Sequence, residues 1–184
     1  MYFKIFWIIR YLFYSLLFKK AGFPGYIGKP IVIIGFKKIS IGKRTRIFPN
    51  VRLEVHGENA SLTIENNVGI SQNVHITTAG QLVIGKDTTI LANTYITDID
   101  HIYENIGIPV LDQGMSVKKT QIGAGCFIGM GVAIQAGTIL GNHCIVGSNS
   151  VVRGNFPDYC VIAGTPARIL KKYNFENQTW EKIS

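Results

Sequence analysis

The stretch IGAGCFIGMGVAIQAGTILGNHCIVGSNSVV, residues 122–152, decides the fold of this chain. An aliphatic residue recurs in it at every sixth position, at Ile122, Ile128, Ile134, Leu140, Val146 and Val152. Four positions after the aliphatic residue the side chain is often small, as at Cys126, Thr138, Cys144 and Ser150. A sustained period of six favours a coil of three short strands and argues against a sandwich or barrel, whose strands alternate with a period of two.

The same step of six occurs earlier in the chain, in three triplets: Ile41, Ile47, Leu53; Ile64, Ile70, Ile76; and Ile84, Ile90, Ile96. Longer steps follow the triplets, with five extra residues after Leu53, two after Ile76 and twenty after Ile96. One coil cannot bury its own apolar face, but stacked coils share a continuous core. The pattern predicts an all-β parallel β-helix of about five coils over residues 21–155, with a long loop at 97–118.

Both ends of the chain depart from the repeat. Residues 1–20 contain the apolar and aromatic run YFKIFWIIRYLFYSLLF, too short in its uncharged part to span a bilayer. We expect a helix there that either caps the open end of the coils or lies on an anionic membrane surface. Residues 156–184 form a predicted C-terminal extension, in which the segment PARILKKY, 166–173, indicates a short basic helix or turn.

The composition narrows the choice of partners and compartment. Nineteen lysines and arginines stand against 11 acidic residues, a net charge of +8, which favours an anionic partner. The three cysteines indicate reduced thiols and a cytoplasmic protein, with peripheral attachment to the cytoplasmic face of the inner membrane as an option. A nucleic-acid partner is not expected, because the sequence contains no recognised nucleic-acid-binding motif.

The long loop holds the densest set of proton-handling side chains, namely Asp98, Asp100, His101, Tyr103 and Glu104. Functional residues concentrate on loops that a rigid scaffold holds in place. A histidine can take a proton near neutral pH, and a nearby carboxylate can orient it. The other histidines, His56, His75 and His143, are interpreted as surface residues.

Three segments carry a family resemblance: ITDIDH at 96–101, the repeat at 122–152, and VIAGTPARIL at 161–170. Together they resemble the hexapeptide-repeat acyltransferases over about residues 30–173. The resemblance is to the branch of maltose, galactoside, nodulation and envelope-polysaccharide O-acetyltransferases. It implies a left-handed β-helix, a homotrimer with sites between neighbouring subunits, acetyl-CoA as acyl donor, no metal, and His101 as general base, with Asp98 and Asp100 beside it.

The resemblance also implies a set of binding residues. The acceptor would contact Tyr103 and either Asn73 or Ser71, of which we prefer Asn73, although an asparagine can also simply stabilise a corner of the coil. The donor would contact Phe127, Gly129, Gly147, Ser148, Gly164, Thr165, Pro166, Arg168 and Lys171. Phe127 stands where this branch usually has tryptophan, which keeps an apolar contact and loses an indole donor.

The expected reaction is transfer of an acetyl group to a sugar hydroxyl of a bacterial envelope glycan or its precursor. Two alternatives stay open at this point. The first is N-acetylation of an amino sugar nucleotide, because an amine also needs a base and an open loop. The second is a β-helix without catalytic activity that serves as a binding module, which a test of acetyl-CoA binding would separate from both enzymes.

Overall fold

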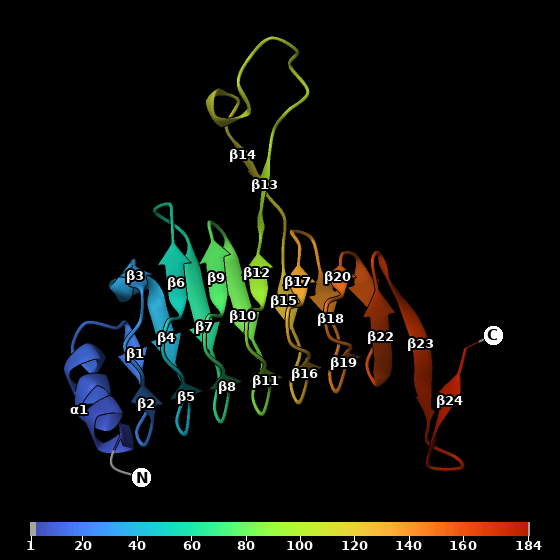
Figure 1. Cartoon of the computed structure of the whole chain (residues 1–184), viewed down its shortest axis with the longest axis horizontal. Helices are drawn as coiled ribbons and strands as arrows, with labels where there is room; N and C mark the ends of the chain where they lie inside the picture. Colours follow the sequence, from blue (N-terminus) through green and yellow to red (C-terminus); the bar gives the residue numbers. More distant parts are fainter. Residues whose placement is uncertain (1–2, 184) are drawn as a thin grey trace.

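The computed structural model describes residues 3–183 and consists of short parallel strands wound into a three-sided prism (Figure 1). Sheet A contains β1 (Lys20–Ala21), β4 (Ile39–Ile41), β7 (Ser61–Ile64), β10 (Gln81–Ile84), β15 (Gln121–Ile122), β18 (Ile139–Leu140) and β21 (Asn155–Phe156). Sheet B contains β2 (Tyr26–Ile27), β5 (Arg46–Ile47), β8 (Gly69–Ile70), β11 (Thr89–Ile90), β16 (Phe127–Ile128), β19 (Ile145–Val146) and β22 (Cys160–Gly164). Sheet C contains β3 (Val32–Ile34), β6 (Arg52–Val55), β9 (His75–Thr78), β12 (Tyr95–Thr97), β17 (Ala133–Ile134) and β20 (Val151–Val152).

The predicted left-handed parallel β-helix is confirmed, and the predicted number of coils is corrected. Six coils have all three strands, and β21 and β22 add two sides of a seventh, where about five coils were expected. Neither end coil follows the aliphatic pattern from which the number of coils was predicted. The first begins at the small Ala21, and the last begins at Phe156, only four residues after Val152.

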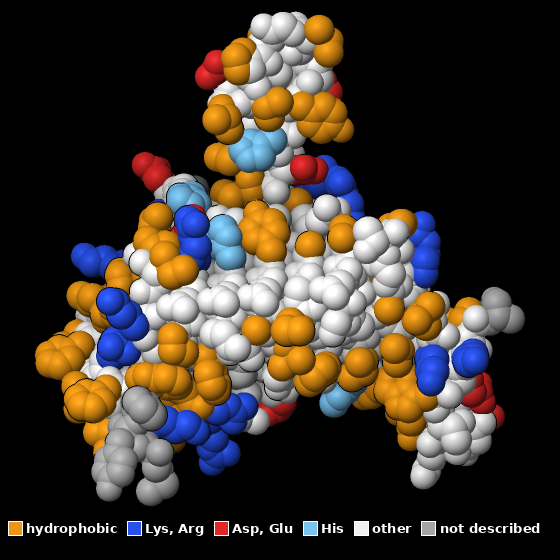
Figure 2. Space-filling model, viewed as in Figure 1, with side chains coloured by type: hydrophobic (Ala, Val, Ile, Leu, Met, Phe, Trp, Pro, Cys, Tyr) orange, Lys and Arg blue, Asp and Glu red, His pale blue; other side chains and the backbone are white. Residues whose placement is uncertain are grey.

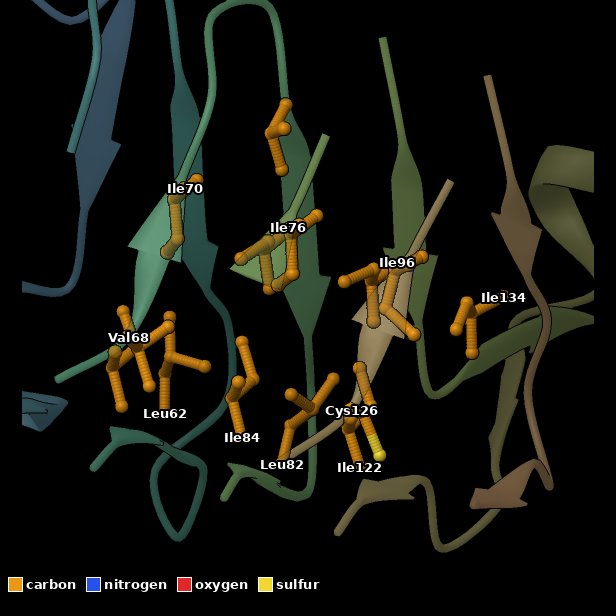
Figure 3. Packing of buried hydrophobic residues seen from close by; sticks show 14 of the residues in the cluster. Leu62, Val68, Ile70, Ile76, Leu82, Ile84, Ile96, Ile122, Cys126 and Ile134 are labelled. Carbon is orange, nitrogen blue, oxygen red and sulfur yellow. The ribbon is translucent and has the colours of Figure 1, made fainter. Parts of the chain in front are cut away.

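The aliphatic residues of the repeat fill the interior of the prism (Figure 3). On each side, residues of successive coils pair in register, as Ile84 does with Ile122 and Ile122 with Leu140. Their side chains have essentially no contact with solvent. Stacking therefore gives each coil the apolar neighbours that it cannot provide alone.

The departures from the six-residue step all occur at one corner. Every step from sheet A to sheet B and from sheet B to sheet C is six residues, from Ala21 to Ile162. The steps from sheet C to sheet A are eight, eleven, eight, twenty-six, six and four residues. We call this the variable corner. The chain can lengthen there because the inserted residues leave the prism without disturbing the stack.

Helix α1 (Phe3–Ser15) covers the open end of the first coil. Trp7, Tyr11, Tyr14 and Phe18 share one face of the helix and the turn that follows it, as spacings of three and four residues require. Tyr11 is buried against Gly25, where a Cβ would lie only 3.0 Å from its ring, and its hydroxyl donates to the Gly22 carbonyl oxygen at 2.8 Å. The segment therefore caps the core. No helix within residues 3–183 is long and apolar enough to cross a bilayer.

The C-terminal segment differs from its prediction. Residues 167–174 form β23 (Ala167–Asn174), which pairs antiparallel with β22 and then with β24 (Thr179–Lys182). The basic helix or turn expected at 166–173 is wrong. A strand forms because Ile169 packs against the core and β22 would otherwise present an open edge.

Candidate active site at the variable corner

The twenty-six-residue step builds an arm that projects from the prism (Figures 1 and 2). Its base is an antiparallel pair, β13 (Ile99–His101) with β14 (Met115–Val117). A loop with one turn of 3-10 helix, η2 (Val110–Asp112), joins the two strands. A second such turn, η1 (Phe36–Lys38), occupies the same corner in the first coil. The expected long loop is therefore partly ordered as a hairpin.

Asp98 fixes the point where the chain leaves the coil. Its carboxylate is buried and accepts hydrogen bonds from the backbone N–H groups of Ala79 at 2.9 Å and Gly80 at 3.0 Å, and from the Thr78 hydroxyl. Three donors on the preceding coil thus occupy both oxygens. The structure gives Asp98 a positioning role in place of the predicted contact with His101.

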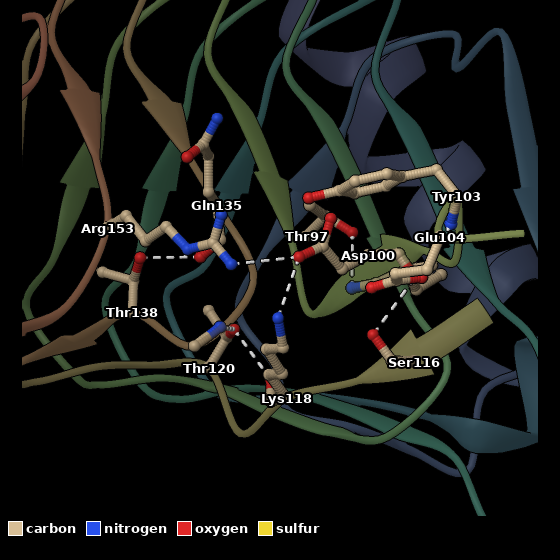
Figure 4. Close-up of polar contacts among 12 residues, drawn as sticks. Thr97, Asp100, Tyr103, Glu104, Ser116, Lys118, Thr120, Gln135, Thr138 and Arg153 are labelled. Atoms are coloured by element: carbon tan, nitrogen blue, oxygen red, sulfur yellow. Dashed lines mark hydrogen bonds and ion pairs between the residues drawn. The ribbon is translucent and has the colours of Figure 1, made fainter. Parts of the chain in front are cut away.

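Asp100 points toward Lys118 and Arg153 (Figure 4), and it lines a different hollow from His101, its neighbour on β13. Its Oδ2 lies 3.0 Å from Lys118 Nζ and 3.1 Å from Arg153 Nη2. The hydrogen bond from Lys118 and the nearby charge of Arg153 outweigh partial burial and hold the pKa of Asp100 below its ordinary value. Neither predicted aspartate therefore orients His101 within this chain.

His101 is exposed at the base of the arm and borders a hollow of about 310 Å³. The hollow lies on the outer face of sheet C and is lined by His56, Thr77, Tyr95, Ile99, His101 and Met115. A second hollow, of about 170 Å³, lies across the arm beside Asp100 and Arg153. Ile99 and Tyr95 line both, so the base of the arm separates them.

A cluster around Glu54 was missed from the sequence. Its side chain is 10% exposed and accepts from Arg52 Nε at 2.7 Å, with the Nε2 atoms of His56 and His75 at 3.4 and 3.5 Å. The His75 ring in turn lies 5.1 Å from the ring of Tyr95. Burial raises the pKa of Glu54, but Arg52 and the two histidines outweigh it, and the pKa lies below its ordinary value.

The register of the repeat could have predicted part of this cluster. Arg52, His75 and Tyr95 each precede an inward residue of sheet C, and they pair in register on adjacent coils. Alternation along a strand then places their side chains together on the outer face. Without this pairing of coils, the sequence predicts only surface residues at His56 and His75.

The expected acceptor contacts do not gather near His101 in one chain. Asn73 takes a positive φ of 58° at the corner between sheets B and C, and its amide donates to Asn93 Oδ1 at 3.1 Å. This is the corner-stabilising arrangement. Ser71 lies at that same corner, where the strands of sheet C begin, whereas the arm leaves from the corner where they end. Tyr103 is exposed on the arm and does not line the hollow beside His101.

The expected donor contacts lie on the coils that follow the arm. Phe127 is 42% exposed on sheet B, and Gly129, Gly147 and Ser148 follow at the corner between sheets B and C. A side chain at Gly129 would lie 2.6 Å from the Ser148 nitrogen and 2.7 Å from the Val146 oxygen. Close stacking of the coils therefore requires this glycine whether or not a ligand approaches.

A β-bulge brings two basic side chains to one face. Arg168 pairs with Ala163 and Lys171 with Val161, while Leu170 is the extra residue between them. Residues three apart on a regular strand face opposite sides, but the extra residue restores the same side. Arg168 and Lys171 therefore both face outward on β23, next to the turn of Gly164, Thr165 and Pro166.

Comparison with known proteins gives the class of this chain. The family described as bacterial transferase hexapeptide (six repeats) matches residues 119–154. A protein assigned to lipopolysaccharide biosynthesis as the O-acetyl transferase WbbJ of Escherichia coli (strain K12) is 35% identical over 160 residues, 83% of this chain and 81% of that protein. The chain belongs to the hexapeptide-repeat acyltransferase family, in the branch that contains envelope-polysaccharide O-acetyltransferases.

Two solved structures are also similar to this chain. AntD, an N-acyltransferase from Bacillus cereus solved with dTDP and 3-hydroxybutyryl-CoA, has a TM-score of 0.77, with 19% identity over 91% of this chain and 90% of that chain. The polysialic acid O-acetyltransferase OatWY has a TM-score of 0.55, with 27% identity over 79% of this chain and 77% of that chain. The AntD likeness concerns the fold, whereas the WbbJ and OatWY likenesses extend to the sequence.

Proposed function

We propose that this protein transfers an acetyl group from acetyl-CoA to a sugar hydroxyl of a bacterial envelope glycan or its precursor. The observation that carries the proposal is the position of His101. It is an exposed imidazole on a β-hairpin, and it lines a hollow on the outer face of sheet C. The likeness to WbbJ and OatWY supports acceptors of this class.

His101 would act as the general base. Acetyl-CoA supplies an acyl group that is already activated as a thioester. The imidazole accepts the proton of the acceptor hydroxyl as that oxygen bonds to the acyl carbon, and it returns the proton to sulfur as the C–S bond breaks. The Asp98 carboxylate keeps the base of the arm in place throughout.

The residues fit a donor on the side of the arm toward the C-terminus. Phe127 offers an exposed apolar ring, and the bulge in β23 presents Arg168 and Lys171 on one face, as phosphate groups require. Phe127 lies on sheet B and Gly129 at the corner between sheets B and C, whereas His101 follows the variable corner between sheets C and A. One chain therefore supports only half of a site.

A homotrimer with sites between neighbouring copies would join the two halves. The arm favours this assembly, because Ile106 and Leu111 at its end are 96% and 82% exposed and lack apolar cover in a single chain. We propose that the arm of one copy packs beside the donor-binding corner of the next.

A screen for CoA release tests the proposed reaction. Neutral sugars, oligosaccharides and nucleotide sugars are offered with acetyl-CoA to the wild type, to His101→Ala and to His143→Ala as control. We expect release that depends on a hydroxyl acceptor and on His101. Preference for an amino sugar nucleotide would replace O-acetylation by N-acetylation. Failure to bind acetyl-CoA by calorimetry would leave a binding module without catalytic activity.

We also propose peripheral attachment to the cytoplasmic face of the inner membrane. Residues 1–53 contain eleven of the 19 lysines and arginines, whereas all 11 acidic residues come later, from Glu54 onward. The face of α1 that does not cap the core exposes Phe6, Leu12 and Phe13. An apolar helix face with surrounding positive charge suits anionic lipid, at roughly 1 kcal/mol for each basic residue near the surface.

Surface variants test this attachment better than truncation, since removal of α1 would uncover Tyr11 and the core. Phe6→Ser with Phe13→Ser should keep the fold and acetyl-CoA binding but no longer sediment with vesicles rich in phosphatidylglycerol. Phe175→Ser, which changes an exposed ring at the opposite end of the prism from α1, is the matched control and should sediment as the wild type does. Equal sedimentation of both variants would contradict the attachment through α1.

A further inference from the structure

The Glu54 cluster and the hollow beside it have no part in the proton transfer just described. They occupy the outer face of sheet C on the coils that precede the arm, those of β6, β9 and β12. The expected donor contacts lie on the coils that follow the arm. His101 itself lines the hollow, so an acceptor held there would bring a hydroxyl beside the proposed base.

We propose that this hollow is the acceptor subsite and that it takes an uncharged pyranose, with Tyr95 and His56 as its direct contacts. Glu54 is a positioning residue that acts through His56. This inference rests on the proposed acetyl transfer, because it names the acceptor class for the same His101.

The Tyr95 ring suits the apolar face of a sugar ring. It is 38% exposed, it borders the hollow, and the His75 ring packs on it at a tilt of 55°. Because His75 packs on it, the Tyr95 ring presents a fixed apolar surface, and binding a sugar there loses little side-chain conformational entropy. This arrangement favours a pyranose over a flexible linear acceptor.

The Glu54 carboxylate lies beside the Nε2 atoms of both histidines. Its oxygens lie 3.4 Å from His56 Nε2 and 3.5 Å from His75 Nε2, so both rings turn this nitrogen toward the carboxylate. His75 Nε2 is buried without a hydrogen-bond partner in the described structure. For His56, which lines the hollow and is 41% exposed, Nδ1 is then the nitrogen left to accept a hydrogen bond from a sugar hydroxyl.

The charges around the hollow disfavour an anionic acceptor. None of its described lining residues is a lysine or arginine. Arg52, on the same face of sheet C, does not line the hollow, and its Nε and Nη2 atoms both contact Glu54, at 2.7 and 2.6 Å. A phosphate or carboxylate on the sugar would meet the Glu54 charge without a free cation to balance it. An uncharged sugar has no such penalty.

Steady-state kinetics with the full chain test the subsite. The acceptors are methyl glucoside, methyl galactoside and methyl mannoside, with glucuronic acid and UDP-glucose as anionic counterparts. Tyr95→Ala and His56→Ala should raise the acceptor KM about five- to tenfold and leave the KM for acetyl-CoA unchanged. Tyr95→Phe should restore the wild-type KM. Glu54→Gln should show the same acceptor defect, with His143→Ala as a control that changes neither constant.

Each outcome decides the inference. Unchanged acceptor KM values in Tyr95→Ala and His56→Ala, with transfer still dependent on His101, would refute the subsite and leave the proposed function intact. Preference of the wild type for the anionic acceptors would also refute it. Loss of acetyl-CoA binding in the wild type would instead overturn the proposed function. Saturation-transfer NMR of the methyl glycosides, with and without Tyr95→Ala, reports binding even where turnover is slow.

Discussion

The variable corner differs in sequence length from the other two corners of the prism. We call these two the strict corners, because every step across them is six residues. Each strict turn in the coils from β4 to β22 takes a single left-handed residue, such as Asn67, Asp87 or Gly125 between sheets A and B and Asn93 or Gly131 between sheets B and C. Asparagine, aspartate and glycine tolerate that conformation best. The variable corner lacks this constraint on length. The regular period builds the scaffold, and the departures from it carry the chemistry.

The difference explains why similar residues have different roles. His143 takes a positive φ of 54° at a strict corner and stacks on Tyr159 at 5.0 Å. His101 follows the variable corner and stands free on the arm. A histidine at a strict corner forms part of the turn, whereas one at the variable corner is available to a substrate.

The sharpest test of this difference exchanges one histidine at a time. His101→Ala should keep the fold and acetyl-CoA binding and lower turnover at least about a hundredfold, since a positioned base contributes that much. His143→Ala should keep turnover within about twofold, because surface positions away from the site rarely matter more. Turnover is measured by CoA release under saturating acetyl-CoA. Near-normal release by His101→Ala would show that His101 is not the general base.

The anchor of the arm should affect stability more than chemistry. Asp98→Asn replaces an acceptor by an amide in front of two backbone N–H donors, which we expect to cost about 1–3 kcal/mol of unfolding free energy. Asp87→Asn, at a strict corner and exposed, is the matched control and should cost less than about 0.5 kcal/mol. Thermal denaturation compares them. Equal stability of the two variants would mean that Asp98 does not hold the arm.

The cysteines test the strict corner between sheets A and B. Cys126 and Cys144 lie on adjacent coils there, as their spacing of eighteen predicts, and Cys160 lies 3.5 Å from Cys144 between sulfurs. Burial raises the pKa of the Cys160 thiol to about 12. All three should stay unlabelled by a thiol reagent in the native protein and react fully in denaturant. Rapid native labelling would show that this corner opens.

The smallest expected effect concerns the ion pairs of the arm. Asp100 contacts Lys118 and Arg153 near the surface, and such pairs contribute between about 0 and 1 kcal/mol. Because the folded-state pKa of Asp100 is lowered, this contribution is present above its unfolded-state pKa and disappears as the pH falls through the folded-state value. Asp100→Asn should therefore lower stability slightly at pH 7 and leave turnover nearly unchanged. A large loss of turnover would indicate that Asp100 takes part in catalysis, as the sequence predicted.

The sequence predicted the parts of the molecule that follow the period. The inward residues and the stacked cysteines come directly from steps of six. Ala21 and Phe156 escaped because a small and an aromatic residue replace the aliphatic one in the end coils. The direction of Asp98 and Asp100 could not be predicted, since it depends on where β13 leaves the coil. The Glu54 cluster needed the pairing of β6, β9 and β12, which lie twenty or more residues apart.

The central claim is that His101 of one copy acts beside the donor-binding face of a neighbour, and mixed oligomers test it most directly. His101→Ala carries one affinity tag and Arg168→Glu with Lys171→Glu carries another, and doubly tagged oligomers are isolated after co-expression. Each parent should be nearly inactive alone. Mixed trimers should recover about a third of the wild-type sites, because in either composition, two-to-one or one-to-two, one of the three interfaces joins an intact His101 to an intact donor face. Activity no higher than that of the parents, in verified mixed oligomers, would place the whole site within one chain and contradict the claim.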